Sequence, residues 1–320
     1  MAVPAKWTIA RAPDLTGRVA VVTGASGGLG YETACGLAAR GATTILAGRN
    51  AARGQAALDR LRARVAETGG AEARADFMML DLGSLRSVAA FAQALGERTD
   101  RLDILVNNAG LMGAPRRAQT EDGFELQFGT NYLGHFALTG RLRPLLLRAP
   151  DGGRVVSVAS LAAWRGRLVF DDLQARHRYT PFGAYRQSKL ANLIFALELD
   201  RLAQSGGWNL HSLAAHPGWA VTDIMANRVP EAPNAAERAI RGMVRVAFRL
   251  MGQSAEAGAR PILFAAAGRE AADGHYYGPA GRGERRGAVA EARVPPQARS
   301  LPAARRLWAV SERLTGVSLS

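Results

Sequence analysis

Short apolar runs alternate with helix-patterned segments along the chain, and this alternation restricts the fold more than any other feature. The first runs are residues 19–23, 43–47, 77–80 and 104–106, with helical patterns between them at 31–39, 50–67 and 85–95. Later runs are 155–158 and 210–215, with long helical stretches at 121–147 and 185–203. Near-continuous apolar strands alternating with helices are typical of a parallel sheet covered on both faces. Right-handed crossovers then predict an α/β, doubly wound parallel sheet of about seven strands with helices on both faces.

The chain has 320 residues without an internal repeat or a low-complexity linker, so we expect a single domain over 1–320. No stretch of eighteen apolar residues predicts a transmembrane helix, and the N-terminal residues lack the apolar region of a signal peptide. A single cysteine, Cys35, excludes an intramolecular disulfide and falls within a helical pattern, where it would be a small buried thiol. These features predict a cytoplasmic protein.

The formal net charge is +14, which raises the question of nucleic acid binding. The arginines are spread along the chain, and no helix-turn-helix, zinc-finger or RNA-binding pattern is present, so no specific nucleic-acid partner is expected. The five histidines form no metal-binding pattern, and no metal is expected. Only two of the 41 basic residues are lysines, Lys6 and Lys189. A lysine in mid-chain therefore suggests chemistry that needs an ammonium, because a guanidinium does not release its proton.

A glycine-rich turn directly follows the first apolar run. It contains Gly24, Ser26, Gly27, Gly28, Leu29 and Gly30. Glycines allow a tight turn and let backbone N–H groups approach a pyrophosphate, and the following helix N-terminus adds partial positive charge. A glycine cluster alone can be an ordinary loop, but its place between the first strand and the first helix predicts dinucleotide binding in a single-domain Rossmann fold.

The long helical pattern 185–203 begins with a tyrosine and a lysine four residues apart. Tyr185 and Lys189 therefore share one face of the helix. A phenol is a poor base at neutral pH, and a nearby ammonium stabilises the phenolate. Such a tyrosine can exchange a proton with a substrate oxygen while hydride moves to or from a nicotinamide.

Together these motifs resemble those of the short-chain dehydrogenase/reductase family. Asn107-Asn108-Ala109-Gly110 resembles the NNAG motif of its single-domain branch, and Asp81-Leu82 matches the place of an adenine contact, although Asp81 could instead cap a helix. The resemblance implies that Ser160 bonds the substrate oxygen and that Asn131 holds a water linking Lys189 to solvent. It also implies that the turn at Pro217, Gly218 and Thr222 meets the nicotinamide.

The serine stands unusually far from the tyrosine. Ser160 precedes Tyr185 by 25 residues, and Asp172, thirteen residues before the tyrosine, cannot donate when ionised. An insertion at 163–183 accounts for the spacing and resembles that of the retinol-dehydrogenase-like and protochlorophyllide-reductase-like branch. This resemblance implies a lipophilic substrate.

The second apolar run ends in Gly48-Arg49-Asn50 without the carboxylate that usually binds the ribose 2′-OH of NAD. Arg49 could instead pair with a 2′-phosphate, so NADP(H) is the expected cofactor and NAD(H) the alternative.

The resemblance covers about 17–277, which we take as the core. It implies a substrate lid over about 222–254, which includes a basic amphipathic pattern at 235–251; docking on an anionic membrane is the alternative for that pattern. A final helix at 303–315 is expected across the sheet edge. Relatives often dimerise through the two long helices, so a homodimer stays open.

The sequence thus predicts an NADP(H)-dependent enzyme that interconverts an alcohol and an aldehyde or ketone on a lipophilic small molecule. The alternative from another class is a non-catalytic NADP(H)-binding sensor or interaction protein on the same fold, which would need none of Tyr185, Lys189 and Ser160. Reduction of a carbon–carbon double bond is a further alternative, to which the single cysteine gives no support.

Overall fold

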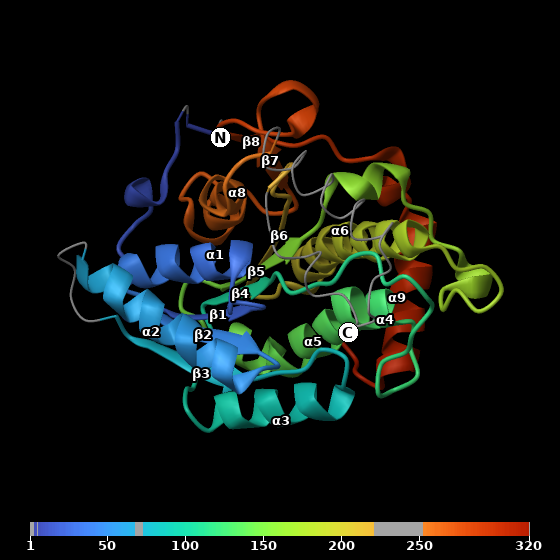
Figure 1. Ribbon diagram of the computed structural model, residues 1–320, viewed down its shortest axis with the longest axis horizontal. Coiled ribbons are helices and arrows are strands. Elements are labelled where there is room, and N and C mark those ends of the chain that lie inside the picture. Colours follow the sequence, from blue (N-terminus) through green and yellow to red (C-terminus); the bar gives the residue numbers. More distant parts are fainter. Residues whose placement is uncertain (1–2, 5, 68–72, 221–251, 320) are drawn as a thin grey trace, which may run out of the picture.

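The computed structural model describes residues 3–4, 6–67, 73–220 and 252–319. Its centre is an eight-stranded sheet in the order β3-β2-β1-β4-β5-β6-β7-β8, in which only the pairing of β7 with β8 is antiparallel (Figure 1). The strands are β1 (Val19–Thr23), β2 (Thr43–Gly48), β3 (Ala75–Met79), β4 (Ile104–Asn107), β5 (Gly153–Val158), β6 (Leu210–Ala215), β7 (Tyr276–Pro279) and β8 (Val289–Glu291). The predicted doubly wound parallel sheet is confirmed, with β7 and β8 extending it beyond the strands read from the sequence.

Helices cover both faces of the sheet. One face carries α3 (Leu85–Gly96), α5 (Gly134–Leu146) and α6 (Pro181–Gly206), and the other carries α1 (Gly28–Ala39), α2 (Ala51–Glu67) and α8 (Ala255–Ala267). Two separate hydrophobic cores result. Along β1 the side chains alternate between them, since Val21 joins one core while Ala20 and Val22 join the other. This period of two is the expected geometry of a strand buried on both faces.

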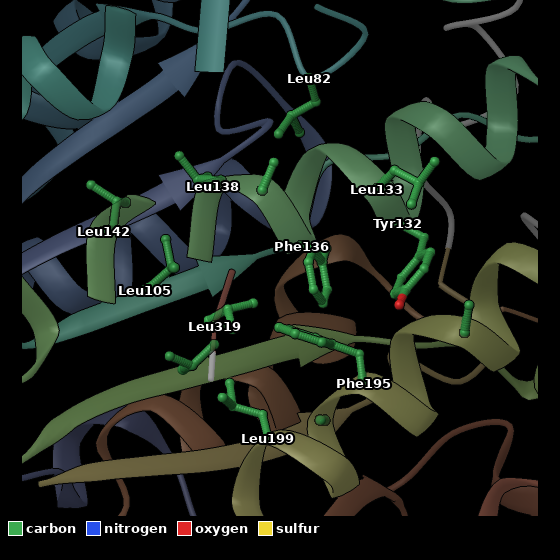
Figure 2. Close-up of a cluster of buried hydrophobic side chains, with 14 of the residues drawn as sticks. Leu82, Leu105, Tyr132, Leu133, Phe136, Leu138, Leu142, Phe195, Leu199 and Leu319 are labelled. Carbon is green, nitrogen blue, oxygen red and sulfur yellow. The ribbon is translucent and has the colours of Figure 1, made fainter. Parts of the chain in front are cut away.

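The core on the α5 and α6 side is rich in large apolar side chains. Figure 2 shows Leu105 of β4 facing Phe136, Leu138 and Leu142 of α5, with Phe195 and Leu199 of α6 across from them. Burial of this kind contributes roughly 25 cal/mol per Å² of apolar surface. It fixes α5 and α6, which carry the residues of interest, against the sheet.

The prediction of one helix over 121–147 is wrong at its beginning, and the helical structure observed there is not uniform. Helical structure starts with the short α4 (Leu126–Phe128), whose N–H groups of Gln127 and Phe128 are capped by the Glu125 carboxylate. A π-helical turn, Gly129–Leu133, joins it to α5. The apolar periodicity showed neither the cap nor the wider turn. In contrast, α6 is longer than predicted, because Thr180 caps it and Pro181 occupies its first turn.

The prediction that the last helix crosses the sheet edge is also wrong. Helix α9 (Leu301–Thr315) instead packs against α6 and α5. Trp308 stacks on Phe195 with ring centroids 5.7 Å apart and meets Phe136 edge-on, and Ser311 shares a 2.7 Å hydrogen bond with the Tyr132 hydroxyl. Helix α9 therefore covers the outer side of the two long helices. These are the helices through which the resemblance suggested a homodimer.

Three further expectations concern burial, membrane spans and metals. Cys35 is buried, as its helical position predicted. None of the helices that the structure describes is long and apolar enough to cross a membrane. Within the same described ranges, no cluster of three or more histidine, cysteine, aspartate or glutamate side chains could hold a metal ion.

Candidate active site

A cleft opens at the carboxyl ends of the central strands, where the strand order reverses between β1 and β4. This switch point is where doubly wound sheets bind ligands. The cleft has a volume of about 170 Å³ and is lined by the glycine-rich turn, the ends of β2 and β3 and the segment after β4. Lining residues predicted from the sequence are Gly24, Ser26, Gly27, Gly28, Leu29, Gly30, Arg49, Asp81, Leu82, Asn108, Ala109 and Gly110.

The glycine-rich turn is packed too tightly for side chains at two positions. A Cβ on Gly30 would lie 2.5 Å from both the Asn108 side chain and the Gly24 carbonyl oxygen. Gly24 has φ +67° and meets the backbone of Ala109. Helix α1 begins directly after Gly27, and no side chain caps its first N–H groups. Those free donors and the positive end of the helix form an anion-binding site at the cleft.

Arg49 lies at the end of β2, beside the place expected for the adenosine ribose, and Arg53 on α2 lines the same part of the cleft. Both are exposed, and neither makes an ion pair within the ranges that the structure describes. Among the residues that the structure describes, Asp81 is the one carboxylate lining the cleft, and its Oδ1 accepts a hydrogen bond from the Gly83 N–H at 2.8 Å. Asp81 thus forms a turn in addition to facing the cleft.

The segment after β4 is held by Thr23. The Thr23 hydroxyl oxygen accepts hydrogen bonds from the N–H groups of Asn108 and Ala109, both at 2.9 Å, and Asn108 Nδ2 donates to the Thr23 carbonyl. Asn107, also predicted to bind cofactor, is not among the lining residues. Its side chain is buried and donates to the Thr139 hydroxyl of α5. Asn107 therefore anchors the strand, whereas Asn108 shapes the cleft.

The predicted catalytic residues meet beside this cleft. Tyr185, in the first turns of α6, is 7% exposed, and the Ser160 side chain influences the pKa of its hydroxyl despite the long separation in sequence. Burial raises the pKa of Tyr185, and the nearby Ser160 side chain partly offsets this rise. The structure therefore brings the predicted serine and tyrosine together. The expected lowering of the Tyr185 pKa by Lys189 is not among the causes of this shift; burial dominates.

Lys189 lies one helical turn after Tyr185 and is buried. Its Nζ donates a 2.8 Å hydrogen bond to the Val158 carbonyl at the end of β5, and burial lowers its pKa to about 8. Gly110 lies close to this ammonium, since a Cβ there would be 3.6 Å from Lys189 Nζ and 3.2 Å from Asn131 Oδ1. An ammonium whose pKa lies this near neutrality can release and regain a proton.

Asn131 sits within the π-helical turn and is completely buried. Its side chain accepts from the Leu111 N–H and donates to the Leu111 carbonyl and to Ser188 Oγ. Ser188 in turn donates to the Tyr185 carbonyl at 2.9 Å. Asn131 thus links the segment after β4 to the catalytic helix. Its own carbonyl accepts from His135 Nδ1 at 2.9 Å, so part of the predicted water-binding position is used by the protein.

The turn after β6 contains Pro217 and Gly218. Gly258 of α8 lies against Pro217 and Leu29, so the turn adjoins the glycine-rich turn. Gln253 donates from Nε2 to the Pro217 carbonyl at 2.7 Å. Thr222, the predicted basic helix 235–251 and nearly all of the predicted lid 222–254 lie outside the described residues.

Sequence reasoning missed three residues that shape the site. His135 connects Asn131 to Thr23, Gln253 holds the turn after β6, and Glu284 faces His216 from the connection between β7 and β8. Glu284 and Gln253 carry no local sequence signal, because their roles arise from contacts between distant segments. His135 is four residues after Asn131, and that helical spacing could have pointed to it.

The residues of the cleft fit a nicotinamide dinucleotide. Uncapped N–H groups of α1 suit a pyrophosphate, and two arginines stand at the ribose end. Lys189, one turn after Tyr185 on α6, approaches the segment at Gly110. The geometry is that of a dinucleotide-dependent oxidoreductase.

Comparison with known proteins agrees with this geometry. Residues 18–232 match the family model described as short chain dehydrogenase. The chain belongs to the short-chain dehydrogenase/reductase family. It is accordingly an NAD(P)-dependent oxidoreductase, and its predicted resemblance to retinol dehydrogenases is confirmed by the curated relatives.

Among these short-chain dehydrogenase relatives, the mouse protein named polyprenol dehydrogenase is 41% identical over 316 residues, covering 95% of this chain and 85% of its own. Human retinol dehydrogenase 13 is 39% identical over 319 residues, covering 99% of this chain and 88% of its own.

Solved structures in the family agree as well. An uncharacterised protein from Mycobacterium paratuberculosis is 38% identical with a TM-score of 0.77, over 98% of this chain and 99% of that one. A short-chain dehydrogenase from Shigella flexneri 2a, solved in complex with NADP, is 25% identical with a TM-score of 0.61, over 83% of this chain and 98% of that one.

Proposed function

We propose that this protein is an NADP(H)-dependent oxidoreductase that interconverts an alcohol and an aldehyde or ketone on a lipophilic small molecule. The observation that carries the proposal is the placement of the buried Tyr185 and Lys189 one turn apart on α6, with the Lys189 ammonium bonded to the Val158 carbonyl two residues before Ser160. A proton donor, a second hydroxyl and a cation close to the dinucleotide cleft suit proton transfer to a carbonyl oxygen.

In the direction of reduction, the glycine-rich turn and Arg49 would hold NADPH, which would provide the hydride for the carbonyl carbon. Tyr185 donates its proton to the carbonyl oxygen, and Ser160 donates a hydrogen bond to the same oxygen. The Lys189 ammonium stabilises the tyrosinate that remains, which then regains a proton from solvent. Asn131 holds the helix in place through Ser188. Oxidation of the alcohol is the reverse, with the Tyr185 phenolate as the base.

NADP(H) is preferred in this proposal because of the charges at the end of β2. Arg49 and Arg53 line the ribose end of the cleft, and an acidic residue is absent from the end of β2 at Ala47-Gly48-Arg49-Asn50. A guanidinium binds a phosphate through two parallel hydrogen bonds. The Shigella relative solved with NADP supports the same choice.

A lipophilic substrate is supported by the relatives and by the insertion. Retinol and polyprenol, which appear in the relatives' names, are both largely apolar alcohols. The insertion 163–183 and the start of α6 expose the side chains of Trp164, Val169 and Phe182. Exposed apolar side chains on segments that flank a site favour an apolar ligand.

The test is NADPH oxidation with a panel of lipophilic aldehydes and ketones by wild type and by Tyr185→Phe. Turnover should fall by about 10²–10⁴-fold in the variant while NADPH still binds. Tyr277→Phe is the matched control, because the buried Tyr277 hydroxyl accepts from the Ala272 N–H and lies outside the site. NADPH binding without turnover of any compound would favour the sensor alternative, and turnover that survives in Tyr185→Phe would refute the assigned role.

A further inference from the structure

The turn after β6 is held from outside by the connection between β7 and β8, residues 280–288, which we call the β7–β8 loop. The Trp219 N–H donates to the Arg285 carbonyl at 2.8 Å, and the Arg285 guanidinium lies 4.3 Å from the centre of the Trp219 ring. Gly218 has φ +63°, and a Cβ there would lie 2.4 Å from the Arg285 carbonyl oxygen. The two backbones are therefore in direct contact.

His216 is the side chain through which the loop reaches the turn. It is completely buried, and its Nδ1 accepts a hydrogen bond from the Gly218 N–H at 3.2 Å. This contact assigns the ring proton to Nε2. His216 Nε2 lies 3.2 Å from Glu284 Oε2. The imidazole thus contacts both the Gly218 backbone and a carboxylate of the β7–β8 loop, although His216 Nε2 and Glu284 Oε2 are not aligned as a hydrogen bond.

Glu284 is fixed on its other side as well. Its Oε1 accepts from the backbone N–H and from Nε of Arg293, both at 3.1 Å. Burial raises the pKa of Glu284, but the hydrogen bonds from Arg293 and the contact with His216 outweigh it, and the pKa falls to about 2. Glu284 also has φ +55°, a left-handed conformation that costs free energy for a residue with a side chain. The contacts with His216 and Arg293 hold it there.

We propose that Glu284 is a positioning residue for the nicotinamide half of the coenzyme, acting through His216 on the turn at Pro217 and Gly218. The inference rests on the proposed NADP(H)-dependent function, in which this turn meets the nicotinamide. The adenosine half binds elsewhere, at the glycine-rich turn and Arg49, which Glu284 does not contact. Loss of the Glu284 carboxylate should therefore weaken the binding of one half of the coenzyme and leave the other unchanged.

The experiment measures Kd for NADPH and for adenosine 2′,5′-bisphosphate, which lacks the nicotinamide. In Glu284→Ala we expect Kd for NADPH to rise about tenfold, because the variant loses the charge-assisted hydrogen bond with Arg293 and the contact with His216. Kd for the bisphosphate should stay within about twofold of wild type. Glu284→Gln should restore most NADPH affinity, because it keeps the length of the side chain and an oxygen that can contact His216 Nε2 and accept from Arg293. Glu291→Ala, on the same hairpin but paired with His275, is the control.

Equal weakening of both ligands in Glu284→Ala would show a general structural role and overturn the inference, as would unchanged binding of both. If wild type binds neither ligand, the proposed function itself fails. If Glu284→Ala does not fold, Arg293→Ala releases one side of the carboxylate while keeping His216 and Glu284. That variant should weaken NADPH binding selectively in the same way, and a lack of selectivity there would also refute the proposal.

Discussion

The ammonium of Lys189 donates a hydrogen bond to the carbonyl oxygen of Val158 at 2.8 Å, which ties α6 to the carboxyl end of β5. Asn192, nearly one turn further along α6, donates to the same oxygen at 3.3 Å. Ser160 follows two residues after this carbonyl, so the contact sets the distance between Ser160 and Tyr185. The insertion lengthens the chain between those two residues without separating them, because the helix is held by the strand.

The buried Lys189 makes stability depend on pH in a defined window. Its pKa is about 8 in the folded protein against an ordinary value of 10.5, so between these values only the unfolded chain keeps the proton. Below pH 8 the buried charge lowers the free energy of unfolding by its full amount. This destabilisation disappears as pH rises toward 10.5. Relative to Lys189→Met, the free energy of unfolding of wild type should rise by on the order of 3 kcal/mol across this window.

Urea unfolding at pH 7, 9 and 10.5 measures this difference between the two proteins. Lys6→Met provides the control, since Lys6 is exposed and is the one other lysine in the sequence. A difference between wild type and Lys189→Met that stays constant over this range would contradict the assigned burial of the charge.

Ser160→Ala should change both the rate and the pH dependence of alcohol oxidation. The Ser160 side chain lowers the pKa of Tyr185, so its removal should raise that pKa further. Because oxidation needs the Tyr185 phenolate, the rising limb of the profile of kcat against pH should move to higher pH. The rate itself should fall about 10²-fold with the loss of a donor to the substrate oxygen. Ser157→Ala is the matched control on β5, and an unshifted profile in Ser160→Ala would argue against direct contact with Tyr185.

The local chemistry of the site could be predicted from the sequence, because it depends on short spacings. The spacing of Tyr185 and Lys189 alone places them on one helical face. Glycines between a predicted strand and a predicted helix likewise indicate a tight turn. The contact of Ser160 with Tyr185 needed the resemblance to a family, since nothing local relates the two residues. The strands of the sheet were visible as apolar runs where both faces are buried.

The parts that could not be predicted depend on contacts between distant segments. Helix α9 is amphipathic and would suit several faces; only the stacking of Trp308 on Phe195 selects α6. Strand β7 ends in Gly278 and Pro279, which lack a strand's apolar pattern, and β8 pairs with it for three residues only. The pairing of His216 with Glu284 joins residues from two turns that the sequence places far apart.

Arg49 should determine the choice between the two nicotinamide coenzymes. Arg49→Ala should raise Kd for NADPH by about 10–100-fold, because a charge-assisted bond to the 2′-phosphate is lost. Kd for NADH, which lacks this phosphate, should stay unchanged. Fluorescence titration of both coenzymes measures this. Arg299→Ala removes the same charge from an exposed position outside the cleft and should alter neither affinity at moderate salt. Equal weakening of NADPH and NADH in Arg49→Ala would refute recognition of the 2′-phosphate.

His135 should make the protein sensitive to acid. Its Nδ1 donates to the Asn131 carbonyl, and its Nε2 lies 2.8 Å from the Thr23 hydroxyl, so the neutral ring joins Asn131 to the end of β1. Burial lowers its pKa from 6.5 to about 3. Between these values the unfolded chain binds a proton that the folded protein does not. The contribution of His135 to the free energy of unfolding therefore has its full value above pH 6.5 and decreases as the pH falls below 6.5.

At pH 7, His135→Gln should be less stable than wild type by about 1–3 kcal/mol, because the buried hydrogen bonds are disturbed. At pH 4 wild type should have lost on the order of 3 kcal/mol through His135 while the variant loses none by this route, so the gap between them closes or reverses. Urea unfolding at both pH values measures the gap, with the exposed His177→Gln as control. Parallel losses in wild type and His135→Gln would mean that His135 is not the acid-sensitive group, and that the bridge between Thr23 and Asn131 tolerates a charged ring.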